Sequence, residues 1–461
     1  MFHNLRMLFM FLTISIMMRG RKMHNLFRLF FAIILIILLP ISEVTVNSSQ
    51  LDESIHSGSF YTDKYENLFL TLLGLNQFDV NEKINNAYNQ LFYGDDANQR
   101  VYYPVHPDMA YIKDILHNDV RSNGMSYGMM IAVQLNRQEE FNRLWNWAKT
   151  YMQHKDEQSK DYFAWQCKTD GTIIGLSTAS DGEEWFITSL FLASNRWGDG
   201  EGIYNYRLEA QKILDAMLNK IPESDNHDDI TNMFNRDAKM VVFVPNGSAD
   251  DFTDPSYHVP HFYELWAIWA DKNNDFWKTC AERSRQFLKS NVHPETGLAS
   301  NYAKFNGTPY KAPWGGRQND FGYDAWRVAM NIAIDYTWFA KDKWEIEQSN
   351  RLLRFFNSQG IDTYGHLYTV DGQVLAKDHR TGLVAVNAVA ALSANIEQRK
   401  EFVEALWNIK VPDGIERYYD GMLYLLAMLQ VSGNFKIYKD RFNPVQDIEK
   451  LQIKNLNTFD K

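Results

Sequence analysis

Asp119-Val-Arg-Ser-Asn-Gly-Met-Ser-Tyr-Gly-Met-Met130 combines polar groups, two glycines and an aromatic ring within a dozen positions. A largely apolar segment, Ile131–Leu135, follows without a break. A helix that is apolar on every side is buried in the core of a protein. The stretch therefore predicts polar chemistry at the mouth of a buried helix.

Helical spacing extends along the chain on both sides of this stretch. Apolar residues at Phe141, Leu144, Trp145, Ala148 and Met152 form one stripe of a helix. Similar spacing at 187–194 and 213–217 predicts two more helices, and others are expected near 61–75, 82–94, 124–136, 257–270, 274–290, 321–341, 343–358, 381–395, 397–409 and 417–431. Strand-like alternation is scarce, with 239–244 as the best candidate. About thirteen helices without regular strand–helix alternation predict one large all-α domain.

The connections between these helices differ in length. Four of them, 155–181, 222–256, 292–320 and 360–380, are long and rich in Gly, Asp, Asn and aromatic residues. Long loops in a compact domain usually carry function. Because long connections alternate with short ones, we expect the helices to pair as hairpins and the long loops to gather at one end.

The composition favours a neutral partner. The chain has 461 residues, a net charge of −10 and 13 tryptophans. Nucleic-acid binding is excluded as the main function, because it depends on clustered Lys and Arg. The two cysteines, Cys167 and Cys280, are too few for a metal cluster or a disulfide framework and are expected to be free buried thiols. No cofactor or metal is expected.

The N-terminus has the features of an export signal. Basic residues up to Arg28 precede the apolar run Leu29–Leu39, which Pro40 and a polar segment follow. Residues 1–50 are therefore predicted to be a leader, with Met23 as a possible true start, and the mature protein to be periplasmic or secreted. An uncleaved anchor is the alternative, and any membrane contact would be through this segment alone. The polar residues 436–461 are predicted to form a C-terminal tail.

Two short motifs suggest chemistry that their surroundings do not support. Gly124-Met-Ser126-Tyr-Gly128 matches the G-x-S-x-G pattern of serine hydrolases, but that motif needs a preceding strand and a parallel sheet. His258 and His261 could bind a metal from one helix turn, but no third ligand stands at a recognisable spacing. Glycines for close helix packing and a packed aromatic cluster are the preferred interpretations.

Carboxylates at two further helix starts are more informative. Asp181 follows a long loop and opens a helix, where capping of backbone N–H groups is the simplest role. Asp324 also precedes an apolar helical run, and Arg327 could either orient a carboxylate or bind substrate. Sugars stack on aromatic rings and their hydrolysis needs two carboxyl groups, so these starts indicate a carbohydrate site.

Five stretches resemble glycoside hydrolase family 8, and most closely its reducing-end xylose-releasing exo-oligoxylanases. They are residues 119–130, 178–202, 254–266, 321–335 and 379–391. The resemblance implies that residues 51–435 form an (α/α)6 barrel with a cleft across one end. It also implies inverting hydrolysis of β-1,4-linked xylo-oligosaccharides, which would be the partner.

The resemblance also implies roles for individual residues. Asp324 stands at the position of the general base, and Asp181 at that of the Asp that holds the distorted sugar. Tyr257 is similar to the tyrosine that positions the attacking water, and His379 to the loop histidine that recognises the reducing end. Tyr127 and Arg327 are predicted to bind substrate.

One departure from the family pattern decides the activity. The family carries Glu immediately before Gly-Met-Ser-Tyr-Gly, whereas this chain has Asn123, which has no proton to donate. Three explanations compete: a sugar-binding pseudoenzyme, another acid such as Asp119 or Glu183, or an altered version of an active enzyme. Asn123 could also simply cap the helix that follows.

Overall fold

The computed structural model describes residues 58–221 and 229–439. The predicted leader, residues 1–50, and most of the predicted tail lie outside the described residues. In the two described ranges, no helix is long and apolar enough to cross a membrane.

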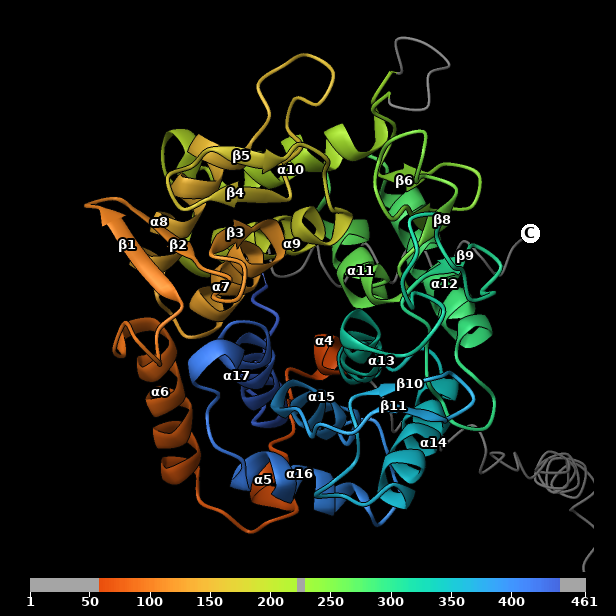
Figure 1. Cartoon of the computed structure of the whole chain (residues 1–461). Helices are drawn as coiled ribbons and strands as arrows, with labels where there is room; N and C mark the ends of the chain where they lie inside the picture. The colour runs from red at the N-terminus through yellow and green to blue at the C-terminus, as the bar shows by residue number, and fades with distance from the viewer. Residues whose placement is uncertain (1–57, 222–228, 440–461) are drawn as a thin grey trace, which may run out of the picture. The chain divides into compact units, whose positions relative to one another are not determined.

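Six of the helices in the described ranges form an inner ring, whose arrangement Figure 1 shows. Each contacts the next in chain order, and the last contacts the first, so the ring is closed. Every residue of α7 except Asn123 is buried, as is every residue of α17 except Tyr419, which explains their apolar sequences. The inner helices are α7 (Ser122–Gln134), α9 (Ser180–Trp197), α11 (Pro260–Trp269), α13 (Trp326–Phe339), α15 (Thr381–Ala390) and α17 (Tyr419–Val431).

Six outer helices of the described ranges cover the ring, and each packs mainly on one inner helix. They bury one stripe only, as shown by Val80, Ile84, Tyr88 and Leu91 of the first. In chain order they are α6 (Gln77–Tyr93), α8 (Gln138–Trp147), α10 (Tyr206–Leu218), α12 (Asn274–Asn291), α14 (Trp344–Ser358) and α16 (Arg399–Asn408). Each of the other five outer helices packs on the inner helix that precedes it in sequence. The first outer helix, α6, packs instead on α17, the last inner helix. The predicted (α/α)6 barrel is confirmed.

The long loops lie at one end of the barrel. All of them lead from an outer helix to the N-terminus of the next inner helix, whereas connections such as 135–137 and 340–343, from inner to outer helices, are short. Strand pairs join neighbouring long loops: β3 (Asp119–Arg121) with β4 (Gln166–Lys168), and β8 (Phe252–Thr253) with β9 (Ala303–Lys304). The inner helices therefore present their N-termini to a shared layer of loops.

The remaining strands are short and antiparallel. The hairpin of β1 and β2 was missed by the sequence analysis, and only Met240–Val241 of the expected strand at 239–244 forms one. These strands are β1 (Tyr102–His106), β2 (Met109–Ile112), β5 (Ile173–Gly175), β6 (Phe234–Asn235), β7 (Met240–Val241), β10 (Leu367–Tyr368) and β11 (Val374–Ala376).

Three expected helices differ from the observed ones. In place of one helix over 61–75 there are two four-residue helices, α4 (Ser59–Thr62) and α5 (Leu68–Thr71), because Asp63 adopts a left-handed conformation and Asn67 caps a new start. The stripe to Met152 continues beyond α8 as a π-helix, Ala148–Met152. The helix expected from 321 begins at Trp326, after a 3-10 turn at Tyr323–Ala325.

Candidate active site

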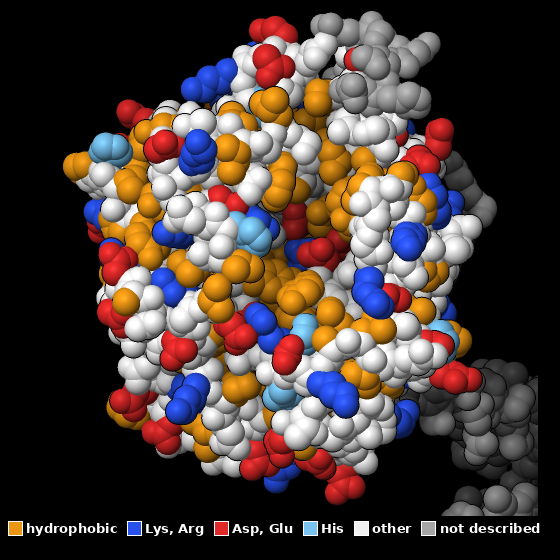
Figure 2. Space-filling model, in the orientation of Figure 1, with side chains coloured by type: hydrophobic (Ala, Val, Ile, Leu, Met, Phe, Trp, Pro, Cys, Tyr) orange, Lys and Arg blue, Asp and Glu red, His pale blue; other side chains and the backbone are white. Residues whose placement is uncertain are grey.

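Residues from three inner helices meet in one cavity of about 360 Å³. Asn123 and Asp181 lie in the first turns of α7 and α9, and Asp324 and Arg327 lie at the start of α13. Figure 2 shows charged side chains in the hollow at the centre of this face. The barrel thus brings together four of the predicted site residues, because its inner helices begin at the same end.

Arg327 is buried and connects three of its neighbours. One terminal nitrogen, Nη1, donates to Asp181 Oδ2 at 2.7 Å and to the Tyr127 hydroxyl at 2.6 Å. The other, Nη2, donates to Asp324 Oδ1 at 2.9 Å. Arg327 therefore positions both carboxylates, and Tyr127 lies behind it rather than among the residues that line the cavity.

The two carboxylates differ in exposure. The Asp324 side chain is 43 % exposed, whereas that of Asp181 is 4 % exposed. Burial raises the pKa of Asp181, and the charge of Arg327 offsets part of that rise. Asp181 is not the cap of α9, since Ala179 occupies that position and the Asp181 side chain bonds to Arg327. A backbone hydrogen bond from Gly182 also lowers the pKa of Asp181, so the carboxylate still meets one N–H of the first turn, as the simpler role predicted.

Asp324 stands where two cavities adjoin. The second cavity has a volume of about 240 Å³ and shares Asp324 and Tyr302 with the first. Leu367 of β10 and Leu375 of β11 also line the second cavity. A solvent-accessible carboxylate thus faces both cavities, a position suited to proton transfer to or from a bound molecule.

Asn123 lines the first cavity from α7. Its Oδ1 accepts hydrogen bonds from the Gly124 N–H at 2.8 Å and from the Tyr418 hydroxyl at 3.1 Å. It does not occupy the N-cap position, which Arg121 holds, but it satisfies the first-turn N–H of Gly124. The side chain faces the same space as Asp181 and Asp324.

Neither alternative acid lines the cavity. Glu183 is fully buried, and one of its oxygens accepts from the Phe163 N–H at 2.8 Å. Asp119 is also buried and bonds to Arg121 and Gln166. Among the described residues, the carboxyl groups that line the first cavity belong to Asp181 and Asp324.

Aromatic side chains form walls of the first cavity. Tyr257 is buried with its ring 5.8 Å from the Arg327 guanidinium and 6.0 Å from the ring of Phe243. Trp314 and Trp165 also line the cavity, and Trp314 is 57 % exposed. The sequence analysis identified Tyr257 but missed both tryptophans, although each lies in one of the long loops that it singled out.

His379 does not line either cavity. It follows β11 in the loop that leads to α15, and its Nδ1 lies 2.9 Å from the Tyr364 carbonyl oxygen. In the same loop, His366 lies 3.4 Å from the hydroxyl of Tyr323, next to Asp324. The loop therefore borders the second cavity through Leu367 of β10 and Leu375 of β11.

The two motifs with alternative chemistry have structural roles. Ser126 is buried inside α7 and donates to the Asn123 carbonyl oxygen at 3.0 Å, while the strand before it belongs to an antiparallel sheet. The ring nitrogens of His258 lie within 3.1 Å of hydroxyls of Ser284 and Thr253. His261 packs against Trp338, and burial lowers the pKa of both histidines to about 3. Neither motif presents a reactive group to the cleft.

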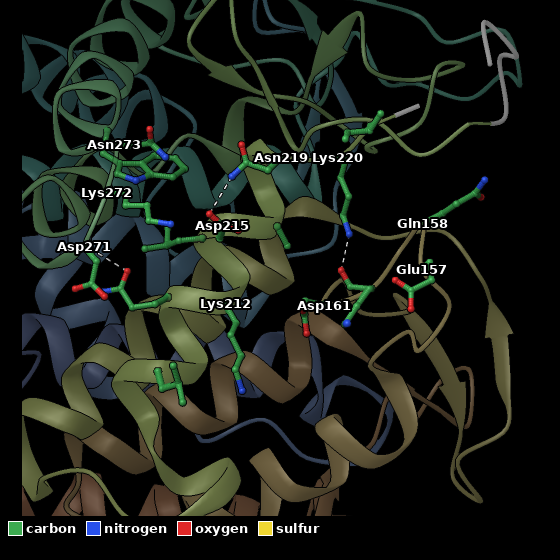
Figure 3. A pocket seen from close by; sticks show the side chains of 17 residues that line it. Glu157, Gln158, Asp161, Lys212, Asp215, Asn219, Lys220, Asp271, Lys272 and Asn273 are labelled. Carbon is green, nitrogen blue, oxygen red and sulfur yellow. Dashed lines mark hydrogen bonds between the residues drawn. The ribbon is translucent and has the colours of Figure 1, made fainter. Parts of the chain in front are cut away.

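A larger hollow, of about 520 Å³, lies on the outside of the barrel against α10 (Figure 3). Its walls carry lysine, aspartate and asparagine side chains, several of which bond to one another, as Asn219 does to Asp215 at 2.9 Å. The tryptophan at its edge, Trp277, is 1 % exposed and offers no stacking face. None of the predicted site residues lines this hollow.

Comparison with known proteins agrees with this geometry. Residues 114–433 match the model of the glycosyl hydrolases family 8. The chain is 44 % identical to a reducing-end xylose-releasing exo-oligoxylanase of Paenibacillus barcinonensis over 83 % of this chain and 98 % of that protein. A structure of the Paenibacillus protein with xylose superposes with a TM-score of 0.79, covering 83 % of this chain and all of that one. A family 8 protein of Teredinibacter turnerae, solved with xylobiose, is 42 % identical over 83 % of this chain and all of that one, also with a TM-score of 0.79. The chain belongs to glycosyl hydrolase family 8.

Proposed function

We propose that the cleft binds β-1,4-linked xylo-oligosaccharides and hydrolyses them with inversion, releasing xylose from the reducing end at a rate limited by Asn123. One observation carries this proposal: Asp324 stands at the junction of two cavities, and Asn123 and Asp181 face the first of them. The similarity to exo-oligoxylanases over almost their full length supports the substrate class.

Asp324 acts as the general base. Its partly exposed carboxylate can take a proton from water, and the bond to Arg327 holds it in place. An inverting glycosidase keeps its acid and base about 6.5–9.5 Å apart so that this water fits beside the sugar. Asp181, with Tyr257 nearby, holds the sugar ring at the point of cleavage.

Asn123 stands where the general acid is needed. An amide cannot protonate the leaving oxygen, and a sugar alkoxide is a poor leaving group. The missing acid costs about 10²–10⁴-fold in rate, or about 3–5 kcal/mol of barrier. The amide can still bond to sugar hydroxyls, so substrate binding is retained.

Release of a single xylose is assigned to the second cavity. The side chains of Leu367 and Leu375 line this cavity, and the loop that carries them also carries His379. A short cavity on one side of the scissile bond accommodates few sugar units. The opposite side, lined by Trp165 and Trp314, accommodates the rest of the chain.

The test uses xylotriose and a xylobioside with a good leaving group, with Asn123→Glu and Asn123→Gln as matched variants. We expect the wild type to cleave the activated substrate, and Asn123→Glu to raise xylotriose turnover at least about a hundredfold. The Gln side chain of Asn123→Gln has the same size as Glu but has no acidic proton. This variant should therefore give no gain in turnover. Equal turnover of the two variants would exclude a missing acid at this position, and NMR of the first-formed anomer checks inversion.

A second candidate is a sugar-binding protein without turnover. The neutral Asn123 in an otherwise complete site favours it. Calorimetric binding of xylotriose, with neither substrate cleaved by the wild type or by Asn123→Glu, would establish this alternative. Cleavage of either substrate by Asn123→Glu would exclude a purely binding role for the scaffold.

We further propose export of the protein, on the order of basic, apolar and polar segments in residues 1–50. Cell fractionation with N-terminal sequencing of the mature chain tests this proposal. A cytoplasmic protein with an intact first segment would contradict it.

A further inference from the structure

Asn123 is followed directly by Gly124. An asparagine side chain can be attacked by the backbone nitrogen of the next residue, which releases ammonia and closes a five-membered succinimide ring. Glycine permits this reaction best, because it has no Cβ to obstruct the nitrogen. Water then opens the ring to leave a carboxyl group. The residue that lacks a carboxyl group in this cleft is thus in the sequence context best suited to acquiring one.

The local geometry brings the reacting groups together. The Asn123 Oδ1 lies 2.8 Å from the Gly124 nitrogen, so the adjoining amide carbon is close to that nitrogen as well. The Gly124 N–H belongs to the first turn of α7, where N–H groups have no acceptor within the helix. The Tyr418 hydroxyl donates to the same Oδ1 at 3.1 Å and would stabilise the negative charge that attack places on this oxygen.

The other two Asn-Gly pairs of the chain are arranged differently. The Gly247 and Gly307 N–H groups donate to the carbonyl oxygens of Asp229 and Lys304, at 3.1 and 2.8 Å. The preceding side chains, Asn246 and Asn306, accept from the N–H two residues further on, at 3.2 and 3.0 Å. In both pairs the asparagine amide and the glycine nitrogen bond to other partners, whereas at Asn123 they bond to each other.

We propose that Asn123 is a self-modification site, at which conversion to aspartate supplies the carboxyl group that the cleft lacks. The Gly124 nitrogen bonds to the side-chain carbon, and the amide leaves as ammonia, taking the proton of that nitrogen. Water then attacks the same carbon and breaks its new bond to nitrogen, which restores the main chain and leaves Asp. The net change is Asn plus water to Asp plus ammonia, with no oxidation or reduction.

Access and packing are compatible with this step. Asn123 lines the open cavity, so water reaches it. A Cβ at position 124 would lie 2.6 Å from the Tyr418 hydroxyl, so the close packing of Tyr418 requires the same glycine that leaves the nitrogen unobstructed. Ring closure needs the first turn of α7 to open, which limits the rate, because helix ends open more readily than helix interiors.

The second possible product of ring opening, isoaspartate, would not supply the acid. If water opens the ring at the main-chain carbonyl carbon instead, the chain continues through the side chain as isoaspartate. That product adds a methylene group to the backbone in the first turn of α7 and displaces the carboxyl group. Activity should therefore follow the aspartate fraction and not the total loss of amide.

The proposal rests on the function proposed above, so the test measures modification and activity separately. Full-length protein is kept in mildly alkaline buffer, and trypsin digests are followed by mass spectrometry of the peptide from Ser122 to Arg137. We expect this peptide to gain the mass of an amide-to-acid conversion, with fragmentation placing the change at Asn123 rather than Asn136. Tyr418→Phe should slow conversion at Asn123 and leave Asn246 and Asn306 unaffected.

Xylotriose turnover is measured on the same samples. General-acid catalysis is worth about 10²–10⁴-fold, and a misplacement of about 1 Å can cost about 10²-fold. Asp is one methylene group shorter than Glu, so complete conversion should raise turnover about tenfold, to the level of a directly made Asn123→Asp variant.

An Asn123 peptide that keeps its mass would overturn the proposal, and conversion at Asn246 or Asn306 in that sample would show that the conditions were adequate. Conversion without any rise in turnover would overturn the functional part of the proposal. If Asn123 converts without a rise in turnover but Asn123→Glu is active, the glycosidase function stands. Only the proposal that Asp at position 123 acts as the acid is then wrong. If Asn123→Glu is also inactive, the proposed glycosidase function fails with it.

Discussion

The two sides of the cleft are held together by different kinds of interaction. On one side a buried arginine, Arg327, bonds to the carboxylates of Asp181 and Asp324. On the other side the neutral Asn123 amide bonds to a tyrosine hydroxyl and a backbone N–H. Removing one partner of a buried ion pair leaves an uncompensated charge, whereas an amide and a carboxylic acid exchange as neutral hydrogen-bonding groups. A departure from the family pattern can therefore be tolerated at Asn123 far more easily than at Arg327.

The largest effect is expected at Asp324. In the Asn123→Glu variant, Asp324→Asn should lower xylotriose turnover by about 10²–10⁴-fold, because the amide cannot accept a proton from water. Asp63→Asn, at a side chain that is 69 % exposed and lines neither cavity, is the matched control and should leave turnover unchanged. Comparable losses in the two variants would show that Asp324 is not the base.

A large effect on stability is expected at Arg327. Arg327→Met should lower the free energy of unfolding by about 3–5 kcal/mol, since it leaves Asp181 buried without its partner. Arg317→Met removes a 3.5 Å pair with Asp320 whose arginine is 67 % exposed, and should cost about 0–1 kcal/mol. Denaturant unfolding of both variants measures the difference. Equal losses in the free energy of unfolding would show that the buried ion pairs of Arg327 do not stabilise their side of the cleft more than an exposed pair does.

A smaller effect is expected on sugar binding. Trp314→Ala should weaken xylotriose binding by about 0.5–1.5 kcal/mol, or about two- to tenfold, because an exposed aromatic face is lost from the cavity wall. Phe78→Ala removes an aromatic ring that is 74 % exposed on the outer helix α6, away from the cleft. Calorimetry should find unchanged affinity in that control. Unchanged affinity in Trp314→Ala would remove Trp314 from the binding surface.

The smallest effect is expected at Tyr418. Tyr418→Phe should lower the free energy of unfolding by about 0.5–1.5 kcal/mol, the net value of one hydrogen bond. Tyr424 lies on α17, which begins directly after Tyr418, and its buried hydroxyl has no hydrogen-bond partner in the described part of the chain. Tyr424→Phe should therefore be neutral or slightly stabilising. If Tyr418→Phe lost as much free energy of unfolding as Arg327→Met, substitutions on the Asn123 side of the cleft would not be the better tolerated ones.

Apolar periodicity predicted most of the helices and an all-α domain, because it directly reflects which faces are buried. The barrel arrangement was implied by the resemblance to a known family. The sequence also placed Asn123, Asp181 and Asp324 at helix starts, which the structure brings into one cavity. It could not reveal the contact between Asn123 and Tyr418, which are 295 positions apart and meet only through closure of the ring. Trp165 and Trp314 were missed because a loop residue carries no periodic signal. Strands of two or three residues were missed for the same reason.

The packing of α6 on α17 determines when the barrel can close during synthesis of the chain. The inner helix that α6 packs against, α17, is the last of the barrel, and α17 also contacts α7 and α15. The apolar sides of these helices cannot all be covered until residue 431 has left the ribosome. Tyr418, the partner of Asn123, immediately precedes α17, so this side of the cleft is assembled last. A ribosome-bound chain that stops before α17 should therefore remain open, exposed to chaperones and without its sugar-binding cleft.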